Sequence, residues 1–225
     1  MLIISHKSSQ QFKEFLHHHG FEFILTIDNP KLDPRIADHP DLSIFVLNKE
    51  TIVVDESVYD YYKQVLINKN IIKGQSVSIK YPNDAIYNIY KASNFYIHND
   101  ISEINILNYL DNNNYIHYYV KQGYTRCSII PMGDKILTSD YGMYKALRNQ
   151  IEVVLLESET ITLDGFDTGF IGGTCGLVGN HLIFDGNIKT SVNYQKIKDE
   201  ADKSSIKLLY PDTDLIDLGS IIDIG

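Results

Sequence analysis

The two cysteines are the strongest nucleophiles in the sequence and its first candidates for chemistry. Cys175 ends a Gly-Gly-Thr-Cys run, and Cys127 also stands before an apolar segment. A thiolate attacks an electrophilic carbon readily when a base or a cation lowers its pKa. For an enzyme we expect Cys175 as nucleophile, with Cys127 as the second choice and His39 or Lys121 as proton-transfer partner. The competing prediction is two core thiols, since cysteine also packs as a small apolar residue.

A larger set of polar and glycine residues marks the starts of several strand-like segments. The set comprises Asp41, Asp84, Asn88, Lys121, Gln122, Tyr124, Gly172 and Gly173. If these starts converge, Asp84 can hold a cation and Lys121 a carboxylate, while amide and hydroxyl groups donate hydrogen bonds. That arrangement fits an amino-acid-like zwitterion. The alternative is a water-filled or internally paired channel in which Asp84 and Lys121 bridge each other.

The histidines do not form a metal-binding pattern. Residues 17–19 are all histidine, but consecutive residues of a helix point in different directions, and cations suit a helix end before Gly20. The other histidines lack Cys or carboxylate partners at ligand spacing. The sequence also lacks a P-loop, a dinucleotide-binding glycine pattern and a nucleophile-elbow serine. We therefore expect no metal and no cofactor.

The elements that must position these residues repeat along the chain. Strand-like apolar runs that end in Asp or Asn occupy residues 52–55, 95–99, 136–140 and 182–185, and their last residues lie 44, 41 and 45 positions apart. An apolar segment precedes the run at 42–45, 127–130 and 175–178, and a helical pattern follows it, for example at 101–110 and 142–147. A further strand closes two units, at 153–156 and 206–209. The repeated unit is therefore ββαβ.

The two ends of the chain supply the halves of a fifth unit. Residues 1–38 read as strand, helix and strand, and residues 211–225 supply further strand material. Pairing the ends closes a ring and removes its exposed edges. We predict one α+β domain over residues 1–225, a closed ring of five ββαβ units at about 39–80, 81–120, 121–158, 159–210, and 211–225 joined with 1–38.

Composition excludes some partners. The net charge is −9 and no basic stripe occurs, so we expect no nucleic acid partner. The acidic balance suits a cationic small ligand if some carboxylates face inward, although a solvated acidic exterior is the commoner explanation. No apolar run of 18 residues occurs, so we expect neither a membrane span nor secretion, and the expected location is the cytoplasm, with both cysteines as thiols. The oligomeric state stays open.

The repeat and its local motifs resemble the pentein fold of the guanidino-group-modifying enzymes. Residues 39–46 resemble the Pro-Asp-x-x-Phe-Val segment of the dimethylarginine dimethylaminohydrolases, and residues 83–88 are similar to their Glu-Ala-Gly-Asp segment. Residues 121–128 and 169–173 look close to an uncharacterised clostridial family of this fold. The resemblance covers nearly the whole chain and implies a ring with an axial ligand site.

The resemblance also implies a catalytic set, which this sequence does not retain. In those enzymes a Cys near the C-terminus attacks the guanidinium carbon, a His transfers protons, and carboxylates hold the cation. The Cys position falls on Ile222, and the His-Leu-Lys motif falls on residues 121–123. Asp84 matches one of the acids, whereas the Glu-Asp pair falls on Leu47 and Asn48.

Three functions remain open on these grounds. The first is a non-hydrolytic protein that binds a small polar, guanidino or amino-acid-like ligand in the axial cavity. The second is a guanidino-group hydrolase or amidinotransferase with a relocated Cys nucleophile. The third is a protein-interaction ring without a small ligand.

Overall fold

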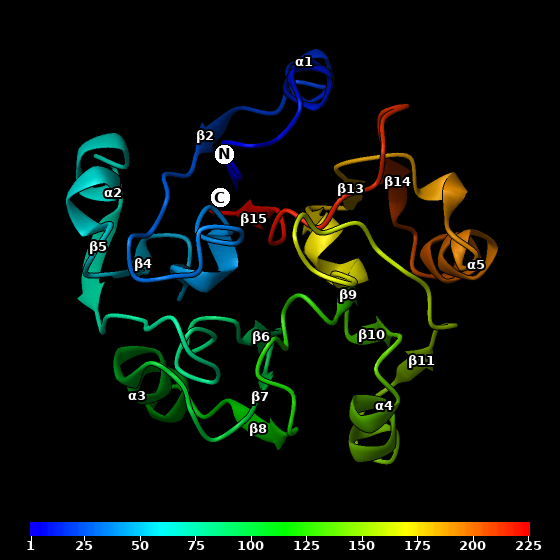
Figure 1. The fold of residues 1–225 in the computed structure, drawn as a ribbon. Coiled ribbons are helices and arrows are strands. Elements are labelled where there is room, and N and C mark those ends of the chain that lie inside the picture. Colours follow the sequence, from blue (N-terminus) through cyan, green and yellow to red (C-terminus); the bar gives the residue numbers. More distant parts are fainter.

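The computed structural model describes residues 1–225 and contains five three-stranded sheets arranged as a ring (Figure 1). Figure 1 shows the five α-helices on the outside of the ring and β6, β9 and β15 near its centre. The predicted number of units and the predicted fold class are therefore confirmed.

Four units follow one another along the chain. The first holds β3 (Ile44–Val46), β4 (Thr51–Asp55), α2 (Tyr59–Val65) and β5 (Asn70–Gly74). The second holds β6 (Tyr90–Lys91), β7 (Phe95–His98), α3 (Ile104–Asn112) and β8 (Ile116–Tyr119). The third holds β9 (Ile130–Met132), β10 (Lys135–Thr138), α4 (Tyr141–Leu147) and β11 (Val153–Leu155). The fourth holds β12 (Cys175–Val178), β13 (His181–Phe184), α5 (Tyr194–Lys203) and β14 (Lys207–Leu209).

In each of these sheets the middle strand pairs antiparallel with the first strand and parallel with the third. A hairpin joins the antiparallel pair, and a helix provides the crossover that a parallel pair needs. The middle strands β4, β7, β10 and β13 are almost entirely buried because they have a partner on both sides.

The fifth unit joins both ends of the chain, as the sequence predicted. It contains β1 (Leu2–Ile4), α1 (Gln10–His18) and β2 (Phe23–Leu25) from the start, and β15 (Ile222–Asp223) from the end. Leu2 lies opposite Asp223 and Ile3 opposite Ile222 in an antiparallel pair, while β1 runs parallel to β2. This pairing gives β1 the two neighbours that every other middle strand has.

Several element boundaries differ from the prediction for local reasons. The first strand of unit one starts at Ile44 because Pro40–Leu42 forms a 3-10 turn. The strand expected at 127–130 begins only at Ile130, since residues 124–129 form turn hydrogen bonds. The helix expected from residue 101 starts at Ile104, because Glu103 is its N-cap and accepts a hydrogen bond from the Ile106 N–H.

Apolar side chains fill the spaces between neighbouring sheets and under the helices. The cluster that joins the fifth unit to the first contains Ile3, Ile44, Ile52, Val54 and Ile224, all nearly inaccessible to solvent. Two 3-10 turns, Pro40–Leu42 and Ile171–Thr174, precede the strands β3 and β12. No helix has the length and apolar character needed to cross a membrane.

Candidate axial site

The starts of the units converge on the axis, where a buried polar cluster joins three of them. The Cys127 Sγ donates a hydrogen bond to Oδ2 of Asp41 at 3.0 Å. The side chain of Asn88 lies between them, with its Nδ2 at 3.2 Å from the Cys127 Sγ and its Oδ1 accepting from the Cys127 N–H at 3.1 Å. All three residues are buried, and the Asp41 Oδ1 has no hydrogen-bond partner.

A second buried carboxyl group faces the axis from the segment before β15. Asp217 accepts hydrogen bonds from the N–H groups of Phe170, at 2.8 Å, and Gly219, at 3.1 Å. Burial raises the pKa of Asp217, and the nearby Asp41 raises it further, while His39 acts in the opposite direction. His39 itself is buried and packs against Gly219. The structure therefore places His39 close to Asp217, and His39 forms no hydrogen bond with Cys175.

The predicted glycines serve close packing at this point. A Cβ atom on Gly173 would lie 2.0 Å from Oδ1 of Asp217. A Cβ atom on Gly172 would lie 2.3 Å from the carbonyl oxygen of Ile129 and 2.4 Å from that of Cys127. Both positions thus have to be glycine for the third, fourth and fifth units to meet.

The remaining predicted ligand residues form a separate arrangement near Asp84. The hydroxyl group of Tyr124 donates to Oδ2 of Asp84 at 2.5 Å, and burial raises the pKa of Asp84. Lys121 is exposed and forms no ion pair, so the internal bridge between Asp84 and Lys121 that the sequence offered as an alternative is absent. Gln122 instead donates to Asp140 and accepts from the N–H of Tyr124.

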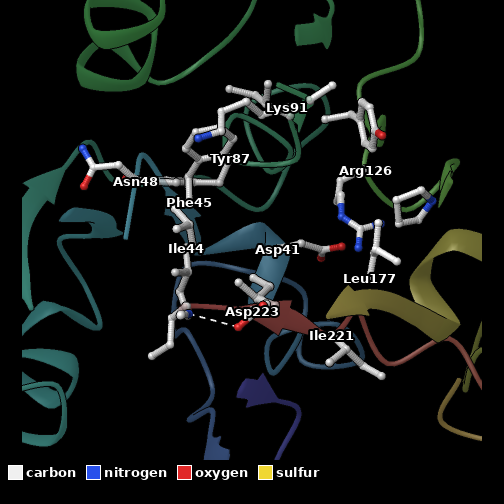
Figure 2. Close-up of a pocket in the computed structure, with 18 of the residues that line it drawn as sticks. Asp41, Ile44, Phe45, Asn48, Tyr87, Lys91, Arg126, Leu177, Ile221 and Asp223 are labelled. Atoms are coloured by element: carbon white, nitrogen blue, oxygen red, sulfur yellow. Dashed lines mark hydrogen bonds between the residues drawn. The ribbon is translucent and has the colours of Figure 1, made fainter. Parts of the chain in front are cut away.

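A cavity of about 500 Å³ opens on the hairpin side of the axis (Figure 2). Its polar wall is formed by Asp41, Asn48, Lys49, Lys91, Arg126 and Asp223, and apolar side chains of the inner strands form the remainder. Figure 2 shows Asp41 and Arg126 among the side chains that line this cavity, and no hydrogen bond joins them. Of the predicted ligand-binding residues, only Asp41 lies in its wall.

Sequence reasoning missed the three cations of this wall, Lys49, Lys91 and Arg126. The guanidinium group of Arg126 donates to the carbonyl oxygens of Ile129, at 3.2 Å, and Cys175, at 3.3 Å, which holds it in place. Lys91 donates to the carbonyl oxygen of Leu47, and burial lowers the pKa of its ammonium group. An Arg directly before a buried Cys was the available signal for Arg126, whereas Lys91 follows an ordinary strand pattern.

Burial disfavours the thiolate form of both cysteines in this arrangement. Burial raises the pKa of Cys175 to about 12, and the opposing effect of Arg126 is smaller. Burial and the carboxylate of Asp41 raise the pKa of Cys127 well above its usual range. The one hydrogen-bond partner of the Cys175 Sγ is the carbonyl oxygen of Gly172, at 3.6 Å. Ile222, which takes the position of the nucleophile in the resemblance, is a residue of β15. The site is therefore equipped for polar binding, and a nucleophilic role for Cys175 with His39 stays a prediction.

Comparison with known proteins places this geometry in context. A family model described as a family of unknown function (DUF6873) matches residues 3–222. A comparison with curated proteins found no match.

Solved structures match over nearly the whole chain. A dimethylarginine dimethylaminohydrolase adduct with S-methyl-L-thiocitrulline has a TM-score of 0.56 at 9% identity, covering 94% of this chain and 92% of that chain. SxtG, an amidinotransferase from Microseira wollei in the saxitoxin biosynthetic pathway, has a TM-score of 0.57 at 9% identity, covering 98% and 80%. A substrate-bound agmatine deiminase from C. jejuni has a TM-score of 0.57 at 11% identity, covering 96% and 80%. At these identities the similarity establishes the pentein fold alone.

Proposed function

The chain belongs to this family of unknown function and has the pentein fold of the guanidino-modifying enzymes, and on that premise we propose that it binds a small zwitterionic ligand of guanidino or amino-acid type in the axial cavity. Asp41 receives the cationic group of the ligand, and Arg126 receives its carboxylate. The protein does so without the Cys and His pair that the fold family uses for catalysis.

The observation that carries this proposal is the free carboxyl oxygen of Asp41. Asp41 is only 2% exposed, its Oδ2 accepts from Cys127, and its Oδ1 has no partner. A buried acceptor that lacks a donor costs about 1–3 kcal/mol, and more when it is charged. A ligand that brings N–H donors to this oxygen removes that cost. The contact with Asp41 should therefore contribute a large part of the binding free energy.

The opposite charges in the same wall select a ligand with two charged ends. Arg126 presents a planar guanidinium group, which suits a carboxylate through paired N–H···O contacts. Lys91 contributes a second, partly buried cation. A volume of about 500 Å³ lies within the range of small-molecule sites, and it holds a molecule of the size of an amino acid.

The test is calorimetric titration of the full-length protein with arginine, agmatine and citrulline. We expect Asp41→Asn to weaken the binding of arginine and agmatine about 10- to 100-fold, which corresponds to one charged hydrogen bond. Arg126→Gln should weaken the binding of arginine to a similar degree. It should weaken the binding of agmatine far less, because agmatine has no carboxylate. Binding of none of these compounds, or equal binding by the wild-type protein and Asp41→Asn, contradicts the proposal.

A control separates lost binding from lost stability. Asp55 is another buried acid, but it lies outside the cavity and accepts from two backbone N–H groups. Asp55→Asn should lower the melting temperature and leave the affinity for arginine unchanged. Release of ammonia or urea from any of the compounds during the titration would overturn the non-catalytic part of the proposal in favour of a hydrolase.

A further inference from the structure

An acidic or amide residue ends or closely follows the second strand of each internal unit, and in most of these units it has the same structural role. Asp55 accepts from the N–H groups of Ser57 and Val77. Asn99 accepts from the N–H of Ile101 at 2.8 Å. Asp140 likewise caps α4 by accepting from the N–H of Met143. In three of the four internal units the side chain of this residue thus accepts hydrogen bonds from backbone N–H groups of the segment that follows the strand.

Asp185, the fourth member of this series, does not perform that task. Its Oδ1 receives only a long hydrogen bond of 3.4 Å from the N–H of Ile216, and its Oδ2 has no partner. Asn187 instead accepts from the N–H of Lys189 and caps the short helix that follows β13. Asp185 is 6% exposed, so the chain buries a carboxyl group that its local structure does not require.

A second cavity, of about 490 Å³, lies where Asp185 is found, between the fourth and fifth units. Residues of α1 and its N-cap form one wall, and the segments around 185–190 and 212–218 form the others. The polar residues of the wall include Ser9, Gln11, Asp185, Asn187, Asp212 and Asp214. This cavity shares no residue with the axial cavity.

The charge in this cavity is negative. Asp185, Asp212 and Asp214 supply three carboxyl groups, and Lys7 is the one basic residue of the wall. The Lys7 ammonium group is already engaged in an ion pair of 2.5 Å with Asp38 and lies near the carbonyl oxygens of residues 34 and 35. A ligand that enters the cavity therefore meets carboxyl groups that accept hydrogen bonds, and the one basic side chain of the wall is already paired.

We propose that this cavity is a second ligand site, which binds a small organic cation with N–H donors, a guanidinium or a primary ammonium group, at the free Oδ2 of Asp185. Asp212 and Asp214 attract the cation at the rim. A metal ion does not suit these donors, because no group of three or more His, Cys, Asp or Glu residues is arranged to hold one.

Binding of a cation should release a proton from the protein. Burial raises the pKa of Asp185 well above its usual range, and the carboxyl group of Asp217 raises it further. A cation at Oδ2 favours the ionised form, so the proton of Asp185 leaves when the ligand arrives.

The test is calorimetric titration of the full-length protein with methylguanidinium and butylammonium chlorides, in two buffers that differ in ionisation enthalpy. Neutral N-methylurea and butanol serve as shape-matched probes. We expect saturable binding of the cations only, with proton release. Asp185→Asn should weaken it about 10- to 100-fold and abolish the proton release. Equal binding of charged and neutral probes, or an unchanged affinity in Asp185→Asn, overturns the proposal.

Two further variants keep the test independent of folding and of the axial site. Thr190 is an exposed residue of the wall, so Thr190→Trp fills the cavity without altering Asp185, and it should also abolish the proton-linked binding. Asp41→Asn removes only the carboxylate that is proposed to hold a cation in the axial cavity, and the proton-linked binding of methylguanidinium at Asp185 should persist in this variant. If Asp41→Asn removes this binding and Thr190→Trp does not, the cation occupies the axial cavity and the second site is refuted.

Discussion

The Cys127 Sγ lies 3.0 Å from Oδ2 of Asp41, so a thiol of the third unit supplies a hydrogen bond to a carboxyl group of the first unit. A carboxylate beside a thiol disfavours the thiolate, because ionisation would place two negative charges together. The contact therefore stabilises the axial cluster and keeps the Asp41 side chain oriented toward the cavity.

Replacement of Cys127 by Ala should destabilise the protein by about 1–3 kcal/mol, because Asp41 then loses its donor inside the core. Cys127→Ser retains a hydroxyl donor and should recover part of this loss. Urea unfolding monitored by circular dichroism gives both values. If the Ala and Ser variants are equally stable, the hydrogen bond to Asp41 contributes nothing measurable.

Both cysteines should be unreactive toward iodoacetamide in the folded protein. Cys127 and Cys175 are buried, and burial raises the pKa of each thiol. Labelling followed by mass spectrometry at neutral pH should find modification only when denaturant unfolds the chain. Rapid modification of Cys175 in the native protein, suppressed by arginine, would instead support the enzyme with a relocated nucleophile.

Closure of the ring should depend on the packing of Ile3. Its side chain is fully buried, in the cluster that contains Ile44 of the first unit and Ile224 of the chain end. Ile3→Ala should cost about 2–5 kcal/mol, the usual range for a large-to-small change in a core. Ile67, which is 80% exposed, provides the control, and Ile67→Ala should change stability by less than about 0.5 kcal/mol. Thermal melts of both variants decide whether the paired chain ends support the fold.

Gly172 should tolerate no side chain. In Gly172→Ala the new Cβ would meet two backbone carbonyl oxygens at 2.3 and 2.4 Å, and backbone cannot move aside as a flexible side chain can. We expect a loss of about 1–3 kcal/mol or more, as for other overpacked cores. Gly142→Ala is the matched control, since Gly142 lies in the first turn of α4 and its nearest foreign atom is a side-chain oxygen at 3.1 Å. It should be neutral or slightly stabilising because alanine favours the helix. Equal stability of the two variants in urea would contradict the packing role of Gly172.

His98 should make the protein acid-sensitive. Burial lowers the pKa of His98 to about 4. Its Nε2 faces the carbonyl oxygen of Gly123 at 2.9 Å and therefore carries the proton, while its Nδ1 accepts from Ser102 at 2.6 Å. A neutral imidazole is thus built into the core.

The sign of this effect follows from the lowered pKa. The unfolded chain takes up a proton near pH 6.5, and the folded chain does so only near pH 4, so stability is complete above the first value and declines as the pH falls toward the second. Between pH 7 and pH 5 the loss amounts to about 2 kcal/mol. His98→Gln should flatten the dependence of unfolding free energy on pH, while exposed His17→Gln should leave it unchanged. An unaltered pH profile in His98→Gln would show that the acid sensitivity has another source.

The repeated turn residues show how far sequence alone reaches. The spacing from Asp55 to Asp185, together with the strand and helix patterns of the two chain ends, predicted five units and the joining of the ends, because each unit contains its own hairpin, helix and parallel strand. Local rules failed at two strand starts, where the turns at residues 40–42 and 124–129 use hydrogen bonds that the apolar pattern does not reveal.

The polar site was less predictable for a physical reason. The sequence selected Asp41 and Asp84 equally, yet only Asp41 borders the axial cavity, and Tyr124 occupies one oxygen of Asp84. Arg126 entered the site only when the third unit folded against the fourth.

The amino-acid sequence by itself determined the unit, the number of units and the closure of the ring, because these follow from apolar periodicity and from turns between neighbouring residues. Only the tertiary structure decided which side of the axis is hollow and which buried carboxyl oxygens lack a donor. Those properties depend on contacts between units, such as that of Cys127 with Asp41, 86 positions apart in the chain. No local pattern encodes whether a partner so distant in sequence arrives within hydrogen-bonding reach.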